Sequence, residues 1–321
     1  MDQILSIVFT TSFAFAVLRI STPLIFAGMA AVVSERAGVV NIAIEGMMLT
    51  SALTGVVVSA FSGSWLAGVV ISVVLSVVIS LVLAYFHLNL KANIIMCGLA
   101  INTIAKGGTI FVLYMLTGNK GASTALASVN VPEIDIPLLK DIPVLGEILS
   151  GQNLLTYLSF LGIIVLHVFI FHTRTGIHIS AVGQNPEAVA SVGINVRRTR
   201  YIALLISGVF AGLGGCFMSM GYMNGFTANM VSGRGFIGLA ANSMGQNAPL
   251  GTMVAALIFG VADAAANNFQ LLRVPTQFIQ MIPYATTLIG ITVYSMKRSG
   301  DKRRRRIKAV KPATKTMEKA G

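Results

Sequence analysis

The sequence predicts an all-α integral membrane protein with about ten transmembrane helices. Apolar residues make up 55% of the 321 residues and charged residues 11%, whereas a soluble domain carries about a quarter charged residues. The apolar runs are long and continuous, as helices that span a bilayer with about 20 residues require. A β-barrel would instead show short segments that alternate apolar and polar residues. Basic residues gather between the runs and in the tail, which is typical of cytoplasmic segments.

The first half of the chain is predicted to cross the membrane five times. Proline and glycine interrupt the second apolar run, so we expect a short half-helix there. The polar residues at 34–38 follow it and are expected to reach the surface. The predicted elements are 3–18, 21–34, 39–60, 66–86 and 94–116.

A long polar segment at 117–153 separates the two halves. It contains prolines and acidic residues but no arginine, so we expect it outside the cell. The predicted elements after it are 154–171, 201–222, 232–247, 250–266 and 276–296.

Counting the short elements 21–34 and 232–247 as crossings gives about ten, with both termini in the cytoplasm. Five crossings in each half would make the halves inverted repeats, as in many transporters. Residues 1–296 are then one transmembrane domain, and 297–321 form a basic cytoplasmic tail that we expect to be disordered. Anionic lipid headgroups are an alternative partner for this tail.

Several classes of function are disfavoured by the sequence. The net charge of +12 resides in loops and in the tail, so we expect no nucleic-acid partner. Cys97 and Cys216 lie in apolar segments and are interpreted as small buried residues. Neither a phosphate-binding loop nor the metal spacings HExxH and CxxC occur, so we predict neither an enzyme nor a cofactor or metal site. If ATP drives transport, another subunit must hydrolyse it.

Polar side chains inside the predicted spans are candidates for a solute pathway, because such residues are costly in lipid and face the bundle interior. Asn41 and Glu45 are four residues apart, which would place them on one helix face. An amide-lined route would suit a neutral solute that forms hydrogen bonds. The alternative is interhelical bonding, including ion pairs of Glu45 or Asp263 with Lys106. The pathway candidates are Asn41, Glu45, Asn102, Lys106, Arg234, Asn242, Gln246 and Asn247.

The stretch 183–194 has the pattern of a short, well-capped helix on the cytoplasmic side. Asn185 is a good N-cap, and Pro186 falls at the first helical position, where its missing N–H group costs nothing. Glu187 places negative charge in the first turn, and Gly193 can end the helix in a left-handed conformation. The pattern predicts a helix at 186–192, roughly 10 Å long.

This stretch resembles the Glu-Ala-Ala…Gly signature of ABC importer permeases, because Glu187-Ala188-Val189 is followed by Gly193. Val189 departs from the alanine of the signature but still suits the small apolar face expected from Ala188, Val189 and Val192. Further blocks are similar to the nucleoside permeases of the simple-sugar and nucleoside branch. These blocks are 35–48, 183–188, 207–215, 233–240 and 247–251, and the resemblance spans about 18–293.

The resemblance implies a coupling helix, at about 184–194, that docks on a cytoplasmic ABC ATP-binding subunit. Its residues would be Asn185, Pro186, Glu187, Ala188, Val189 and Gly193. Further implied partners are a second, related permease subunit and an extracytoplasmic solute-binding lipoprotein, in the bacterial cytoplasmic membrane.

The implied solute is a nucleoside, with simple sugars as the first alternative. An ion-coupled secondary transporter that titrates Glu45, Lys106 or Asp263 is an alternative of another class, and a membrane scaffold or membrane-bound enzyme is a third. The energy source separates the first two classes, because only ion-coupled uptake is abolished by a protonophore and survives loss of the ATPase.

Overall fold

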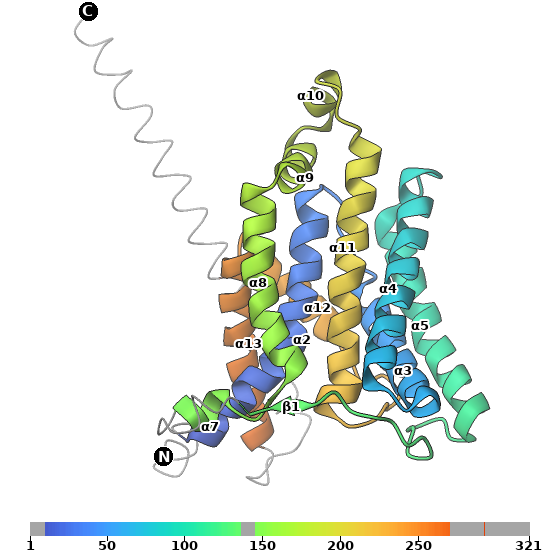
Figure 1. The fold of residues 1–321 in the computed structure, drawn as a ribbon. Coiled ribbons are helices and arrows are strands. Elements are labelled where there is room, and N and C mark those ends of the chain that lie inside the picture. Colours follow the sequence, from blue (N-terminus) through green and yellow to red (C-terminus); the bar gives the residue numbers. More distant parts are fainter. Residues whose placement is uncertain (1–9, 136–144, 270–291, 293–321) are drawn as a thin grey trace, which may run out of the picture.

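The computed structural model describes residues 10–135, 145–269 and 292, which form a helical bundle (Figure 1). Seven helices of this part are long and apolar enough to cross a membrane, which confirms the all-α membrane class. They are α2 (Thr11–Arg36), α3 (Ile44–Ser62), α4 (Trp65–Leu88), α5 (Ile94–Thr117), α8 (Leu154–His172), α11 (Val196–Phe217) with the π-helical turn η1 (Met218–Tyr222), and α13 (Pro249–Phe269). The predicted span 276–296 and the tail 297–321 lie outside the described residues, except for residue 292.

Shorter elements occupy the two ends and the interior of the bundle. They are α7 (Leu145–Leu149), α9 (Arg174–Gln184), α10 (Pro186–Ser191), α12 (Arg234–Met244) and the antiparallel strands β1 (Glu133–Ile134) and β2 (Gln152–Asn153). Figure 1 shows β1 and α7 at the end of the bundle opposite α10. The long polar segment and the capped helix therefore lie at opposite ends, as the sequence predicts for an outer loop and a cytoplasmic helix.

Helix α2 is continuous, so the prediction of separate crossings at 3–18 and 21–34 is wrong. Pro23 lies inside this helix, and the residues around it are buried. The Ser21 hydroxyl donates to the Val17 carbonyl at 2.7 Å, and the Thr22 hydroxyl donates to the Leu18 carbonyl at 2.8 Å. Neither hydroxyl bonds the Arg19 carbonyl, which is the one that loses its donor at Pro23, so the packing of the buried helix against its neighbours is what keeps it helical. Pro23 therefore does not end this helix.

The continuity of α2 changes the predicted topology. Its first turns lie near the outer segment, where the Gln152 side-chain amide donates to the Phe15 carbonyl at 3.1 Å (Figure 1). The first described crossing therefore begins at the end opposite α10, so its start and α10 do not lie on one side as the sequence predicted. Among the described residues, four spanning helices rather than five precede the outer segment. The seven spanning helices of the described residues do not confirm the count of ten crossings in two five-helix halves.

The second predicted span, 39–60, begins later than expected. Residues 37–43 are not helical, and α3 starts at Ile44. Asn102 on α5 stabilises this break, because its side-chain oxygen accepts from the Gly46 N–H at 2.7 Å and its NH₂ donates to the Ile42 carbonyl at 2.9 Å. Asn41 lies within the break, so it does not share a helix face with Glu45 as the spacing predicted.

The glycines of α11 allow close approach of neighbouring helices, as expected for packing in lipid. A β-carbon on Gly215 would overlap the backbone oxygen of Met48 on α3. Gly107 on α5 is the opposite case, since nothing lies within 4 Å of where its β-carbon would be.

Gly215→Ala is therefore expected to destabilise the bundle by about 1–3 kcal/mol, because the opposing group is backbone and cannot rotate away. The measurement is the melting temperature of the detergent-purified protein, followed as the fraction that stays monodisperse on heating. Gly107→Ala is the matched control and is expected to leave that temperature unchanged or slightly raised. Equal melting temperatures for both variants would contradict the close α3–α11 contact.

Candidate functional site

Helix α10 has the caps that its sequence predicts. The Asn185 side-chain oxygen accepts from the Ala188 N–H at 3.0 Å, and Pro186 is the first helical residue. Gly193 follows the helix with a φ of 85°, and its N–H donates to the Ala190 carbonyl at 3.0 Å. The regular helix ends at Ser191, one residue before the predicted end. These local contacts make α10 a compact projection at one end of the bundle (Figure 1).

The side chains of α10 divide into an inward and an outward set. Val189 is 8% exposed and packs toward the protein, whereas Val192 is 72% exposed. The predicted single apolar face of Ala188, Val189 and Val192 is therefore wrong, since Ala188 is also exposed. Because residue 189 points inward, valine in place of the signature alanine leaves the outward surface unchanged.

Helix α9 was not predicted from the sequence. It directly precedes α10 and lies between α10 and the rest of the bundle (Figure 1). Thr173 caps it by accepting from the Gly176 N–H at 3.1 Å, while Ile179 and Val182 are buried. Near its end, a β-carbon on Gly183 would overlap the backbone oxygen of Arg36. The threonine cap and the spacing of the apolar residues were the signals that could have predicted α9.

Helix α12 is a short helix, about 16 Å long and so about half the thickness of a bilayer core. The Glu45 carboxylate holds its N-terminus: Oε1 accepts from the Gly233 N–H at 2.7 Å, and Oε2 accepts from the Gly235 N–H at 2.8 Å. Glu45 is 2% exposed. A carboxylate at this position satisfies N–H groups that a helix start leaves free and opposes the positive end of the helix dipole.

A cation lies at the other end of α12. The Arg36 Nε donates to the Asn247 carbonyl at 2.5 Å, in the turn between α12 and α13. The segment 36–45 thus contacts both ends of α12, with positive charge at the C-terminal end and negative charge at the N-terminal end. Both charges match the helix dipole. The segments 35–48 and 233–251 are far apart along the chain, but these hydrogen bonds join them in the structure.

The predicted amides are largely engaged within the protein. The Asn242 NH₂ donates to the Asn247 side-chain oxygen at 2.9 Å, and Asn242 is also a side-chain partner of Glu35. The Asn41 NH₂ donates to the Ser207 hydroxyl on α11 at 2.9 Å. Gln246 and Asn247 occupy the turn after α12 with φ values of 60° and 56°.

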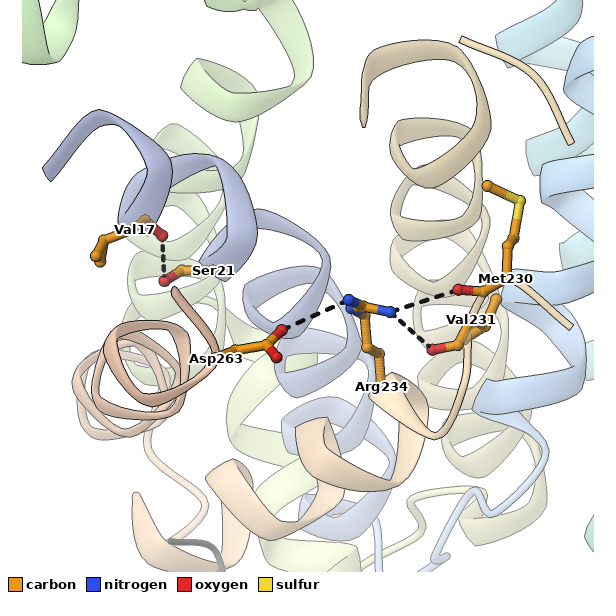
Figure 2. Close-up of polar contacts among 6 residues, drawn as sticks. All are labelled: Val17, Ser21, Met230, Val231, Arg234 and Asp263. Atoms are coloured by element: carbon orange, nitrogen blue, oxygen red, sulfur yellow. Dashed lines mark hydrogen bonds and ion pairs between the residues drawn. The ribbon is translucent and has the colours of Figure 1, made fainter. Parts of the chain in front are cut away.

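An ion pair connects α12 to α13. The Arg234 guanidinium lies 3.5 Å from the Asp263 carboxylate and donates to the Met230 and Val231 carbonyls at 3.4 Å each (Figure 2). The alternative prediction that Asp263 pairs with Lys106 is therefore wrong. Ser21, on neighbouring α2 in Figure 2, donates to its own helix rather than to this pair.

Lys106 lies one turn after Asn102 near the middle of α5, and its side chain is exposed whereas that of Asn102 is buried. Within the described part of the chain, no carboxylate lies at ion-pair distance from its ammonium group. Lys106 still attracts the Glu45 carboxylate over a longer distance. The structure thus brings Glu45 and Arg234 together at one end of α12, and Asn242, Gln246 and Asn247 at the other. A role in solute passage stays a prediction for all eight residues.

Comparisons with known proteins identify the family of this chain. A family described as branched-chain amino acid transport system / permease component matches residues 13–291. The guanosine ABC transporter permease protein NupQ of Bacillus subtilis is 35% identical over 301 residues, which cover 90% of this chain and 92% of the relative. The nucleoside ABC transporter permease protein NupC of Lactococcus lactis is 32% identical, covering 85% of this chain and 89% of the relative.

A glucose ABC transporter permease protein of Haloferax volcanii is 25% identical, covering 88% of this chain and 77% of the relative. No solved structure matches. Because the family match covers most of the chain, and the first two relatives exceed 30% identity over most of both lengths, the chain belongs to the branched-chain amino acid transport system permease family and is a permease component of an ABC transport system.

Proposed function

We propose that this chain is the membrane permease of an importer that moves nucleosides across the bacterial cytoplasmic membrane, driven by ATP hydrolysis on a separate subunit. The similarity to guanosine and nucleoside permeases over nearly the whole chain carries the choice of solute. The capped helix α10 at one end of the bundle supports the separate ATPase, because the chain itself has no phosphate-binding loop.

Helix α10 is the proposed docking element for the ATPase. Its outward side presents Glu187, Ala188 and Val192, while Val189 anchors it to the bundle. Asn185 and Gly193 cap the two ends of α10 and satisfy terminal backbone groups. Such a helix can be displaced as a rigid element without unfolding.

The solute pathway is proposed to run beside α5, where Lys106 is exposed. A lysine near the middle of a span is costly against lipid and is normally found beside a cavity, a partner or water. A second, related permease subunit placed against this surface would shield Lys106 from lipid. The amides of the α12 turn and the Glu45–Arg234 region would border the same route from within the bundle.

The remaining partners follow from the same assignment. An extracytoplasmic solute-binding lipoprotein would deliver the nucleoside at the end that bears β1 and α7. The side of α10 would be cytoplasmic, and the basic tail 297–321 would lie on that side, as the positive-inside rule predicts.

Uptake of radiolabelled guanosine by cells with and without the gene tests the proposal. We expect uptake to vanish on deletion, to return with the gene, and to be competed by other nucleosides but not by glucose. Uptake should survive a protonophore while ATP is maintained and should stop when ATP is depleted. Guanosine uptake that persists after deletion would contradict the proposal.

Glucose is the second candidate solute, favoured by the similarity to a glucose permease. Labelled glucose in the same cells decides between the two, since gene-dependent glucose uptake without gene-dependent guanosine uptake would reverse the assignment.

A further inference from the structure

The guanidinium of Arg36 contacts three separate parts of the protein at the α10 end of the bundle. Nε donates to the Asn247 carbonyl in the α12–α13 turn at 2.5 Å, and a terminal nitrogen donates to the Ser180 hydroxyl on α9 at 3.1 Å. The same group lies over the Phe171 ring of α8, 4.5 Å from its centroid. A planar guanidinium can serve such contacts at the same time, because its donors point in fixed, different directions.

The contact with α9 reaches the docking element directly. Helix α9 is followed by Asn185, which both ends α9 and caps α10. The glycine at 183 brings the end of α9 into backbone contact with the end of α2, next to Arg36. A displacement of α10 is therefore expected to move α9, and α9 is hydrogen-bonded to Arg36 through Ser180.

The contact with Asn247 reaches the interior of the bundle. The turn that contains Asn247 closes α12, and the other end of α12 is held by the Glu45 carboxylate. Hydrogen bonds fix α12 at both of its ends. We therefore expect a displacement of the Asn247 turn to move the whole helix. The Asn242–Asn247 side-chain bond of 2.9 Å stiffens that turn.

We propose that Arg36 is a coupling residue, which transmits displacement of the docking helices α9 and α10 to α12 and thereby to the solute pathway. The inference rests on the proposed function, since it assumes that an ATPase moves α10. Arg36 touches no solute in this assignment, so it acts through the positions of Ser180 and Asn247.

The experiment compares variants of the complete transport complex, purified with its ATPase and reconstituted in liposomes. Arg36→Lys keeps the charge but removes the planar fork, so one ammonium cannot hold both partners. Ser180→Ala removes only the α9 side of the link and is the milder variant, which decides the question if Arg36→Lys does not assemble. The readout is the number of nucleosides transported per ATP hydrolysed, measured beside complex yield.

Arg19→Lys is the matched control. Arg19 lies on the same helix toward its other end, donates to the Gly221 and Tyr222 carbonyls at 3.2 and 3.0 Å, and lies over the Tyr222 ring. It has no described contact with α9 or with the α12–α13 turn.

We expect both test variants to lower the transport-to-ATP ratio, by about fivefold or more for Arg36→Lys, as is typical of a coupling between two sites. ATP hydrolysis and complex yield should stay near wild type, and Arg19→Lys should keep the wild-type ratio. An unchanged ratio in Ser180→Ala and in any assembled Arg36→Lys complex would overturn the inference, as would an equal fall in Arg19→Lys. A wild-type complex without ATP-dependent nucleoside transport would instead refute the proposed function.

Discussion

Replacing Glu45 by glutamine is expected to lower the stability of the bundle and to abolish transport. The carboxylate accepts one N–H group on each oxygen, from Gly233 and Gly235. Glutamine offers one acceptor oxygen and turns an NH₂ group toward the second N–H. A hydrogen bond to a charged group contributes about 1.5–3 kcal/mol, and a buried N–H group left without an acceptor costs about 1–3 kcal/mol, so the total loss is expected to be ~3 kcal/mol or more.

The loss of stability extends beyond the missing hydrogen bond. The negative charge opposes the positive end of the α12 dipole and attracts Arg234 and Lys106. Without it, α12 is held firmly only at the Arg36 end, and the ion pair between Arg234 and Asp263 loses its neighbouring anion. The position of α12 would then be poorly defined, and this is the reason to expect loss of uptake as well as stability.

The measurement combines the melting temperature of the purified protein with guanosine uptake. For a chain of this size, ~3 kcal/mol corresponds to a fall of about 5–10 °C. Glu45→Asp keeps the charge and should recover part of both losses. Glu133→Gln, at an exposed position of strand β1, is the control for stability and should keep the wild-type melting temperature. Wild-type uptake that a protonophore abolishes, together with a Glu45→Gln variant that keeps the wild-type melting temperature but loses this response, would favour the titrating carboxylate of an ion-coupled transporter.

Reversing the charge of Glu187 is expected to reduce uptake at least about tenfold, which corresponds to ~1.4 kcal/mol of lost coupling. Glu187 is exposed in the first turn of α10. An arginine there opposes the helix dipole by only about 0.3–1 kcal/mol, so α10 should still fold. The larger effect arises on the outward surface, where the proposed ATPase partner would meet a positive charge in place of a negative one.

Membrane abundance, co-purification of the ATPase and uptake are measured together for Glu187→Arg. Abundance should be normal, while co-purification and uptake fall. Glu147→Arg is the matched control for co-purification of the ATPase, because Glu147 is exposed in the first turn of the short helix α7 at the opposite end of the bundle. Normal uptake by Glu187→Arg, or an equal loss of the co-purified ATPase in both variants, would argue against docking at α10.

The sequence alone predicted the membrane class, the capped helix α10 and the opposite placement of the outer segment. These features depend on composition or on contacts within a few residues, as for the Asn185 cap on Ala188. The same local rules gave a wrong result at Pro23, because burial among neighbouring elements keeps α2 helical through the proline. They also placed Asn41 in a helix, although Asn102 of α5 stabilises a break there.

The tertiary structure decided which groups the buried charges meet. Glu45 was recognised as a costly residue in a span, but its partners are backbone N–H groups located 188 and 190 residues further along the chain. Backbone donors are present at nearly every residue, so no side-chain pattern reveals which of them a helix start leaves free in space. The sequence did not predict a functional role for Arg36 for the same reason, because its closest partner is the backbone carbonyl oxygen of Asn247. Composition and local spacing thus determined that this is a helical membrane protein with a short capped helix, while the fold alone determined how that helix connects to the interior.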